Sequence, residues 1–526
     1  MEAAAAGREV ELKLEVAAAD LPGLFGRPWL RALAEGRPGS QTLWSVYYDT
    51  ADLALWRSGL VLRVRAAGRR RIVGVKTRGV VRGGLVAREE REGPLAGGAA
   101  DPRRVVPAAL LASIAEPRLR SAVERAAAGE RLIPCVSTRF RRRTLRLRVG
   151  TARVELALDA GEVSAGRARL PIRELELELL SGPTRALFDV ALRLAAEAEL
   201  RPSSVGKAER GFARLLGEEA PAVRAAPVPL APDASLEAML RAVLAECMRH
   251  ATANQPAVER GSPEGVHQMR VGARRLRSAL RLLEAWLPPR AAGELSRELR
   301  WLARELGRAR DLDVFLGETL GPILAGRPED AGLAVWRDAA EAARAEAYAA
   351  VRASLASQRY ALLVLRLGRF VDGASFRGRG AASLAARAEP EARRLLRRLA
   401  GRMRSLGERL DRLSPRDLHR LRIRTKRLRY ACELLGPLFR GKAPARAARR
   451  LATLQDALGR LNDLANAEAL IAQLRERTGA ATSPEAARAE GFVLGYAARS
   501  SAAGRGELAR AWRRVARLEP FWQARS

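Results

Sequence analysis

The chain has 526 residues, more than one hydrophobic core usually accommodates, so we expect at least two domains. Its formal net charge of +35 attracts polyanions. The three widely separated cysteines argue against a disulfide framework or a cysteine metal site, and favour a reducing, cytoplasmic location. The sequence has no long uncharged apolar stretch, no signal-peptide pattern and no P-loop motif, so we expect neither a membrane protein nor a P-loop NTPase.

Residues 8 to about 180 contain many short runs in which apolar and polar side chains alternate. Examples are REVELKLEV at 8–16, SGLVLRVRA at 58–66 and LPIRELELELL at 170–180. This alternation predicts β-strands with two chemically different faces. Helices are expected between them, at about 20–35, 103–128 and 183–200.

The charged faces of these strands are sorted by sign. Glu9, Glu11 and Lys13 share one face of the first strand. Acidic residues also gather on the late strands and basic residues on the intervening ones: Glu155 with Asp159, Glu174 with Glu176 and Glu178, Arg63 with Arg65, and Lys76. A solvated face would mix such residues freely. The sorting favours a barrel with a charged lumen, where carboxylates bind divalent cations and basic side chains bind phosphates.

A change of pattern follows this first region. Residues 217–235, GEEAPAVRAAPVPLAPDAS, are rich in Pro and Ala and predict an extended linker. From about residue 235 onward the pattern is helical almost to the end. We therefore expect a first domain at 1–216, a linker at 217–233 and an all-α domain at 234–526.

The helical region contains an internal repeat. VHQMRVGARRLRSAL at 266–280 matches LHRLRIRTKRLRYAC at 418–432, a shift of 152 residues. The same shift places ELGRARDLD at 305–313 on ALGRLNDLA at 457–465. Two matches at one shift predict a duplicated helical bundle with pseudo-twofold symmetry.

Each copy carries a basic stripe that begins with a histidine. On a helix of 3.6 residues per turn, His267, Arg270, Arg274, Arg277 and Arg281 fall within an arc of about 80°. In the second copy the same arc holds His419, Arg422, Lys426 and Arg429, and Glu433 replaces the last arginine. Arg308 and Arg310 in the first copy, and Arg460 in the second, are expected to add to the site from the following helices.

Like charges at this spacing cost energy unless water or an anion neutralises them. Two of the three histidines, His267 and His419, occupy matching places in the repeat. His250 has no matching histidine and no basic stripe beside it, and it is expected to be structural. Arginine suits phosphate oxygens, and the stripes contain almost no aromatic side chains for base stacking. The pattern therefore favours inorganic polyphosphate over nucleic acid.

These stripes, with RDLDVF at 310–315, LQDALGRLND at 454–463 and the closing PFW at 520–522, resemble a CHAD domain, a conserved-histidine α-helical domain. The resemblance covers about 234–526 and implies a duplicated helical bundle that binds polyphosphate. By position it assigns that role to His267, Arg270, Arg274, Arg277, Arg281, Arg308, His419, Arg422, Lys426 and Arg429.

The first region has an ordered series of motifs: E-x-E-x-K at 9–13, YYDT at 47–50, LRVR at 62–65, VKT at 75–77, R-x-E-x-E at 88–92, E-x-x-x-D at 155–159, ELELEL at 174–179 and a late Lys207. Over about 7–215 this series resembles a CYTH domain, a triphosphate tunnel metalloenzyme. The resemblance implies an eight-stranded antiparallel barrel whose tunnel binds a triphosphate with Mg²⁺ or Mn²⁺.

The same resemblance implies three sets of site residues. Phosphates would be bound by Arg63, Arg65, Lys76, Arg88, Arg142 and Lys207. Metal would be bound by Glu9, Glu11, Asp159, Glu174 and Glu176, and the catalytic set would be Glu9, Glu11, Lys13 and Glu176. Arg139, Arg141 and Arg143 are alternatives to Arg142, and Leu145 stands where the family often has Trp.

The resulting hypothesis is hydrolysis of inorganic triphosphate to pyrophosphate and phosphate in the barrel, with polyphosphate bound by the helical domain. The expected location is the cytoplasm, in association with polyphosphate granules. Adenylate cyclase, thiamine triphosphatase and a non-catalytic polyphosphate-binding scaffold are the alternatives.

Overall fold

The computed structural model of the chain describes residues 8–77, 79–95, 101–217, 220–373, 376, 384–461, 463–478 and 483–523. It divides into two units, each described by itself below. The first unit contains the residues up to Pro221 together with residues 356–374, and the second contains the other helical residues.

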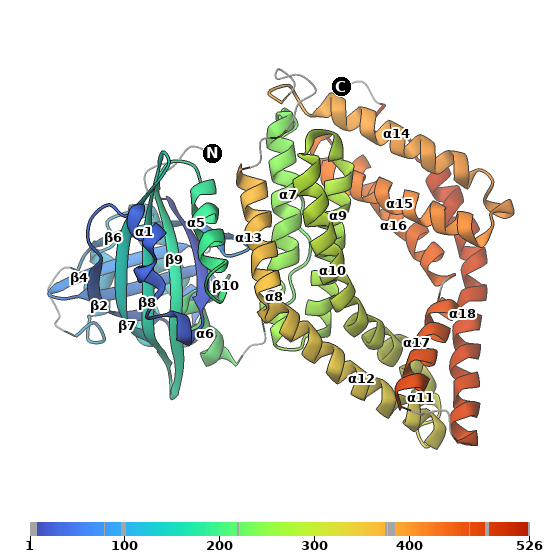
Figure 1. The fold of residues 1–526 in the computed structure, drawn as a ribbon, viewed down its shortest axis with the longest axis horizontal. Coiled ribbons are helices and arrows are strands. Elements are labelled where there is room, and N and C mark those ends of the chain that lie inside the picture. Colours follow the sequence, from blue (N-terminus) through green and yellow to red (C-terminus); the bar gives the residue numbers. More distant parts are fainter. Residues whose placement is uncertain are drawn as a thin grey trace. The chain divides into compact units, whose positions relative to one another are not determined.

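Eight antiparallel strands of the first unit form a closed barrel (Figure 1). Their order around the barrel is β1 (Arg8–Val16), β9 (Ala168–Ser181), β8 (Ala152–Ala165), β7 (Ile133–Val149), β2 (Gly39–Asp49), β3 (Leu60–Ala67), β4 (Arg70–Thr77) and β6 (Leu85–Pro94). The barrel closes because β6 also pairs with β1, with Glu9 opposite Arg88. Two short strands, β5 (Val80–Arg82) and β10 (Leu200–Pro202), pair with β6 and β1. The predicted eight-stranded antiparallel barrel is confirmed.

The apolar positions of the alternating strands face outward and are covered by helices. On one side, Leu12, Leu14 and Leu177 are fully buried in a cluster that includes Phe188 of α5 (Arg185–Ala195) and Leu365 of α13 (Gln358–Gly373). The charged positions of the same strands therefore face the lumen, because side chains alternate between the two faces of a strand.

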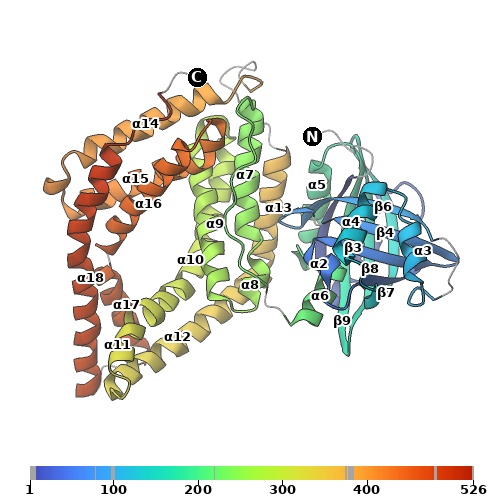
Figure 2. The same ribbon diagram turned by 180° about the vertical axis from the view of Figure 1, so that it is seen from behind.

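The other side of the barrel has its own apolar cluster. Leu62 and Val64 of β3 pack with Leu55 of α2 (Ala54–Arg57), Leu110 of α3 (Pro107–Ala112) and Val123 of α4 (Pro117–Ala127). Figure 2 shows these three helices on the outside of the barrel. Two further helices, α1 (Pro28–Ala32) and α6 (Lys207–Leu216), complete the unit. Helices thus form in the three intervals predicted for them.

The second unit is helical throughout its regular structure. Its helices are α7 (Leu236–Thr252), α8 (Gln255–Glu259), α9 (Pro263–Leu282), α10 (Pro289–Val314), α11 (Gly321–Gly326), α12 (Ala331–Ala356), α14 (Glu389–Gly407), α15 (Pro415–Leu435), α16 (Ala443–Arg460), α17 (Asp463–Thr478) and α18 (Pro484–Ala516). Among the described residues, no helix is long and apolar enough to cross a membrane.

The internal repeat recurs in the helix boundaries. Ser262 caps α9 by accepting a hydrogen bond from the Gly265 amide, and Ser414 caps α15 in the same way from Asp417. Each cap is followed by a proline in the first helical turn, where a missing N–H costs nothing. Both helices end in a short 3₁₀ turn, at 284–286 and at 436–438. The two copies therefore share their local structure as well as their sequence.

Residues 220–233 of the linker predicted at 217–233 form neither helix nor strand, and residues 223–228 lie beside helices of the second unit. Val223 exchanges two hydrogen bonds with the Asn254 side chain, of 2.8 and 2.9 Å. The Ala226 amide donates to Glu246, and Val228 is only 2% exposed. Since these residues are bonded and buried, this segment is part of the second unit's packed structure.

Candidate active site and anion groove

The lumen of the barrel contains the E-x-E-x-K motif of β1. Lys13 lies 3.2 Å from Glu11 and 3.1 Å from Glu176 of β9, and all three side chains are buried. Burial alone would lower the pKa of Lys13, but the Glu11 and Glu176 carboxylates hold it above its usual value. Lys13 is therefore a charged group between two carboxylates.

Arg88 of β6 bridges the two glutamates of β1. Its guanidinium donates to Glu9 at 2.9 Å and to Glu11 at 2.6 Å. Lys76 of β4 lies 3.5 Å from Glu9 and also pairs with Glu90. Burial and the neighbouring Arg63 and Arg88 charges lower the pKa of Lys76 to about 8. The neighbouring cations and burial together lower the pKa of Lys76 more than the nearby carboxylates raise it. An anionic ligand would therefore be electrostatically favoured beside Lys76.

Two arginines of β3 complete the basic wall. Arg63 pairs with Glu90, at 2.8 Å, and with Glu92. Arg65 lies 3.7 Å from Glu92, and burial together with Arg63 lowers the pKa of Arg65 to about 10. An arginine with a lowered pKa is a poorly compensated positive charge, as expected of a phosphate-binding position.

The opposite wall gathers carboxylates around Lys207, the first residue of α6. Its ammonium lies 2.8 Å from Asp159, 2.5 Å from Glu174 and 2.8 Å from Glu176. These three charges raise the pKa of Lys207, against the effect of burial. Arg142 of β7 bonds to Asp159 at 2.7 and 2.8 Å and also reaches Glu176. Arg142, rather than its neighbours, is thus the arginine of this strand that meets these carboxylates.

The structure therefore brings together all the residues assigned to the tunnel. Arg210, which bonds to Glu174 one helical turn after Lys207, was not predicted as a site residue. Glu90 and Glu92, which neutralise Arg63, were not predicted as site residues either. The sequence spacing could have indicated all three residues. Glu90 and Glu92 follow Arg88 at the two-residue period of a strand, and Arg210 follows Lys207 by three residues, which places both on one helix face.

Glu178 is a further unassigned carboxylate. It is the third glutamate of ELELEL and lies opposite Glu11 on β1 and Glu155 on β8. Burial raises the pKa of Glu178 to about 7, and the charges of Glu9, Glu155 and Glu11 add to the rise. This position therefore takes up a proton near neutral pH.

No three Asp, Glu, His or Cys side chains among the described residues are arranged to hold a metal ion by themselves. The tunnel carboxylates are instead bonded to lysine and arginine. Asp159, Glu174 and Glu176 nevertheless converge on one cation, Lys207, and all are oxygen donors, which Mg²⁺ and Mn²⁺ prefer.

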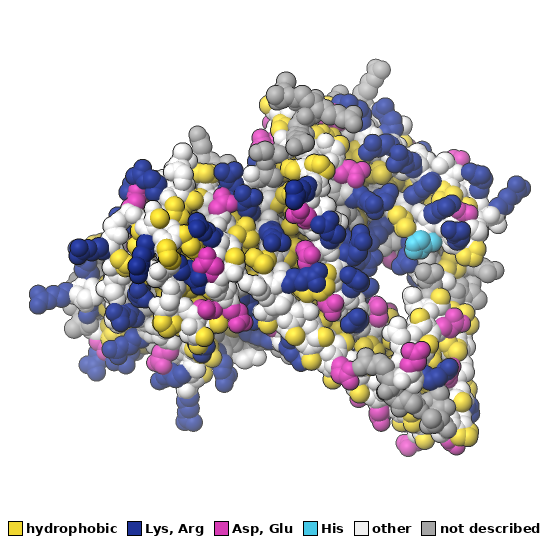
Figure 3. Space-filling view, in the orientation of Figure 1, with side chains coloured by type: hydrophobic (Ala, Val, Ile, Leu, Met, Phe, Trp, Pro, Cys, Tyr) yellow, Lys and Arg dark blue, Asp and Glu magenta, His cyan; other side chains and the backbone are white. Residues whose placement is uncertain are grey.

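In the helical unit, one groove is lined by Arg270, Arg274, Arg277 and Arg281 of the first stripe and by Lys426 of the second. The groove has a volume of about 470 Å³, and both α9 and α15 line it. We call it the anion groove and define it by its basic residues: Arg270, Arg274, Arg277, Arg281, Arg300, Arg304, Arg398, Arg402, Lys426 and Arg427. Figure 3 shows Lys and Arg side chains gathered over α9 and α10 on the visible face.

Lys426 is the most perturbed group of the anion groove. Burial lowers its pKa to about 7, and the charges of Arg274 and Arg277 from α9 and of Arg422 and Arg429 from α15 lower it further. Among the described residues, no carboxylate forms an ion pair with Arg274, Arg277 or Lys426, although the charge of Arg274 acts on Asp311. The two stripes thus form one concentrated positive field.

The groove extends beyond the two predicted stripes. Arg300 and Arg304 belong to α10, and Arg398 and Arg402 belong to α14. Each pair has the four-residue spacing that places side chains on one helix face. The signal was present in the sequence, but these pairs lie outside the repeated motif.

The remaining stripe residues have different environments. His267 is half-buried, and burial with the nearby Arg310 charge lowers its pKa. Arg281 is exposed at the edge of the anion groove, whereas His419 is exposed and does not line it. Arg308 and Arg422 line a neighbouring cavity of about 1140 Å³ that begins at the same Arg270 and Arg274 and contains several carboxylates.

One residue of the second stripe and two of the residues predicted to add to the site pair with acids. Arg429 bonds to Glu433 at 3.0 Å, Arg310 bonds to Glu318 at 3.0 Å, and Arg460 pairs with Glu507. His250 is fully buried and lies 3.0 Å from the Gln268 amide oxygen, in line with the structural role expected for it.

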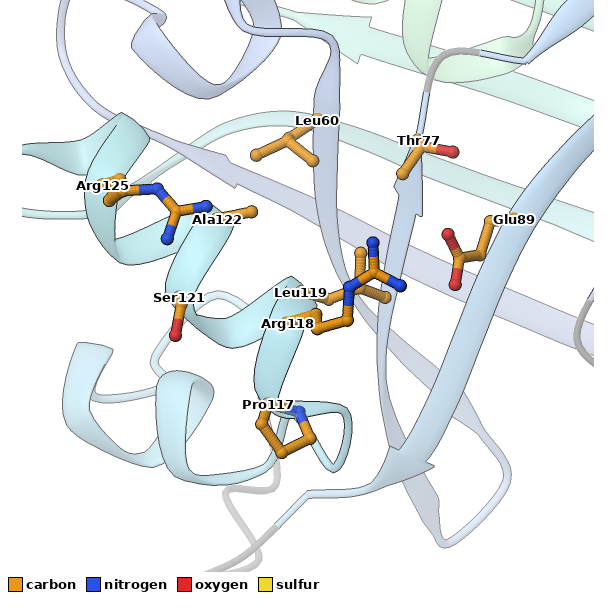
Figure 4. A pocket seen from close by; sticks show the side chains of 9 residues that line it. All are labelled: Leu60, Thr77, Glu89, Pro117, Arg118, Leu119, Ser121, Ala122 and Arg125. Carbon is orange, nitrogen blue, oxygen red and sulfur yellow. The ribbon is translucent and has the colours of Figure 1, made fainter.

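One more pocket lies on the outside of the barrel, between α4 and strands β3, β4 and β6. Figure 4 shows the Arg118 side chain of α4 pointing toward Glu89 of β6, with Ser121 and Arg125 farther along the same helix. None of the residues assigned to the tunnel lines this pocket. Glu89 points away from the lumen, because Arg88 and Glu90 on either side of it point inward.

The closed barrel with its charged lumen is typical of the tunnel-barrel class of proteins. Comparison with known families gives the same class. Residues 7–212 match the CYTH domain, and residues 242–472 match the CHAD domain. The chain therefore carries a CYTH domain followed by a CHAD domain, as the motifs predicted.

Individual relatives cover parts of the chain. An inorganic triphosphatase of Haemophilus influenzae is 32% identical over 177 residues, which are 34% of this chain and 46% of that protein. An uncharacterized protein of Mycobacterium tuberculosis is 30% identical over 285 residues, 53% of this chain and 54% of that protein. The chain thus spans about half the length of these curated relatives. The crystal structure of a CHAD domain from Ricinus communis is 34% identical, with a TM-score of 0.49, and the match covers 57% of this chain and 98% of that one.

Proposed function

We propose that the barrel hydrolyses inorganic triphosphate to pyrophosphate and phosphate with a divalent metal ion. The observation that carries the proposal is the convergence of buried cations and carboxylates in the lumen. Arg65 and Lys76 keep lowered pKa values although carboxylates lie beside them, so their positive charge is poorly compensated, and three carboxylates gather around Lys207 on the opposite side. The relationship to a triphosphatase supports the same activity.

A triphosphate carries several negative charges, which repel a nucleophile. In the proposed complex, Arg63, Arg65, Lys76, Arg88, Arg142 and Lys207 neutralise these charges and hold the phosphate chain in line. Binding would also raise the lowered pKa of Lys76, because a new anion favours its charged form. Substrate and the Lys76 proton therefore stabilise one another.

Mg²⁺ or Mn²⁺ would be held by Glu9, Glu11, Asp159, Glu174 and Glu176. The metal would supply charge neutralisation and lower the pKa of a bound water. Glu176, between Lys13 and Lys207, orients these two ammonium groups. Glu9 and Glu11 hold Arg88 in the lumen.

We further propose that the anion groove binds inorganic polyphosphate. Arg274, Arg277 and Lys426 come from both copies of the repeat and meet without an ion pair to a described carboxylate, so a linear polyanion would relieve their mutual repulsion. The proposed setting is the cytoplasm, with association with polyphosphate granules.

The test is a substrate panel with product identification. The wild-type chain is given tripolyphosphate, thiamine triphosphate or ATP, with Mg²⁺, with Mn²⁺ or with a chelator. The proposal expects pyrophosphate and phosphate from tripolyphosphate, and only with metal. Cyclic AMP from ATP would instead indicate a cyclase, faster turnover of thiamine triphosphate an organic triphosphatase, and no turnover a scaffold.

A further inference from the structure

A helix from the C-terminal part of the chain belongs to the barrel's own unit. Helix α13 lies within the stretch that matches the CHAD domain, yet it packs on α5 and β10 of the barrel. Leu365 of α13 is fully buried in the same apolar cluster as Phe188 and Leu200. A side chain on Gly368 would overlap the Phe188 ring, so the two helices approach more closely than larger residues permit.

Polar contacts fix this helix on the barrel. Arg82 of β5 donates to both carboxylate oxygens of Asp372, at 2.6 and 2.7 Å, and both side chains are largely buried. Gln358 donates to the Ala195 carbonyl at the end of α5, at 2.7 Å. A more exposed pair joins Arg369 to Asp189 of α5. Helix α13 therefore contacts both the β5–β6 hairpin and the end of α5.

The β5–β6 hairpin and the segment after β10 both support Lys13 in the lumen. The Lys13 amide donates to the Gly84 carbonyl at 2.9 Å, and Gly84 is in the turn that follows Arg82. The Lys13 carbonyl accepts from the Ser203 amide at 3.0 Å, and Ser203 directly follows β10. Each segment that bonds the Lys13 backbone is thus held from outside by α13.

We propose that α13 positions Lys13, and with it the phosphate-binding wall at Arg88, by clamping the β5–β6 hairpin and β10 through the Arg82–Asp372 pair. Arg82 and Asp372 are positioning residues, which act through Lys13. The link to catalysis rests on the proposed function, but the link to the Lys13 backbone does not.

The test uses the full chain with Arg82→Asp, Asp372→Arg and the double reversal, and Arg369→Asp as the matched control in the same interface. Hydrogen exchange of peptides that contain the Lys13 and Ser203 amides is the first measurement. We expect each single reversal to speed exchange there about tenfold, the double variant to restore it, and Arg369→Asp to leave it unchanged. Unchanged exchange at Lys13, or no restoration, would overturn the proposal.

The KM for tripolyphosphate is the second measurement. In an active wild-type enzyme, the single reversals should raise KM roughly three- to tenfold, and the double reversal should return it to near the wild-type value. A merely structural role would lower the unfolding temperature without changing KM. An inactive wild type would refute the proposed function, while the exchange result would still decide the role of α13.

Discussion

The ammonium of Lys207 lies 2.8 Å from the carboxylate of Asp159, although Lys207 begins helix α6 and Asp159 lies on strand β8. Asp159 is fully buried, so this pair is shielded from water. Glu174 and Glu176 approach the same ammonium, so Lys207 is the cation that all three carboxylates share.

Replacing Lys207 with Met should destabilise the chain by about 3 kcal/mol, because three buried carboxylates lose their common partner. Mg²⁺ should recover part of this loss, since a divalent cation can take the place of the ammonium. Thermal unfolding with and without Mg²⁺ measures both effects. Arg214→Met on the exposed side of the same helix is the control, and equal stability of the two variants would contradict the prediction.

Glu178 should make stability depend on pH. Its carboxyl has a pKa of about 7 in the folded chain, above its ordinary value, so the folded state binds a proton that the unfolded state releases. The stability that this proton contributes is fully present below the pKa of Glu178 in the unfolded chain. It is lost as the pH rises through the pKa of Glu178 in the folded chain. Glu178→Gln should therefore raise the unfolding temperature at pH 8 and change it little at pH 4.

Replacing the exposed Glu162 with Gln is the control for the unfolding temperatures at pH 8 and pH 4. Glu162 lies on β8, outside the group of carboxylates around Glu178. A Glu178→Gln variant that is less stable than wild type at pH 8 would show that its ionised form is favoured in the folded chain.

Lys426 should make polyphosphate binding depend on pH. With a free pKa of about 7, Lys426 is mostly neutral at pH 8 and must gain a proton when the anion binds. The Kd for long-chain polyphosphate should rise about fivefold between pH 7 and pH 8, at constant salt. Lys426→Arg should remove most of this rise. An unchanged slope in that variant would assign the pH dependence to other groups.

Removing two residues of the first stripe, of which Arg274 lines the anion groove, tests the proposed polyphosphate binding. The paired change His267→Ala and Arg274→Ala should weaken polyphosphate binding at least roughly tenfold, because it removes a guanidinium that forms no ion pair among the described residues. Arg290→Ala, on an exposed surface outside the groove, is the charge-matched control, because the lowered pKa of His267 leaves that side chain neutral at pH 7 and the paired change removes one positive charge. Equal weakening by the paired change and by Arg290→Ala would mean that only net charge matters. Competition with DNA at matched salt separates polyphosphate from general polyanion binding.

Much of the barrel could be predicted because a strand has a strict two-residue period. Glu9, Glu11 and Lys13 had to share a face, and the apolar residues between them had to cover the other. The same holds for the stripe on α9, where Met269 and Leu276 are buried opposite the arginines. These features depend only on local geometry.

Features that depend on contacts between distant elements could not be predicted. The raised pKa of Glu178 requires the registers of β1 and β8, which place Glu11 and Glu155 beside it. The packing of α13 on the barrel depends on Gly368 meeting Phe188, a contact that helical periodicity does not indicate. The partner of Arg142 depends on the pairing of β7 with β8, which places it opposite Asp159.

The central claim is most directly tested by phosphate release from tripolyphosphate by wild type and Glu11→Ala, at saturating Mg²⁺ or Mn²⁺. Glu89→Gln, on the outer face of β6, is the control and should retain full activity. We predict metal-dependent turnover by wild type and by the control, and none by Glu11→Ala. Near-normal turnover by Glu11→Ala would contradict the assignment of the active site to this tunnel.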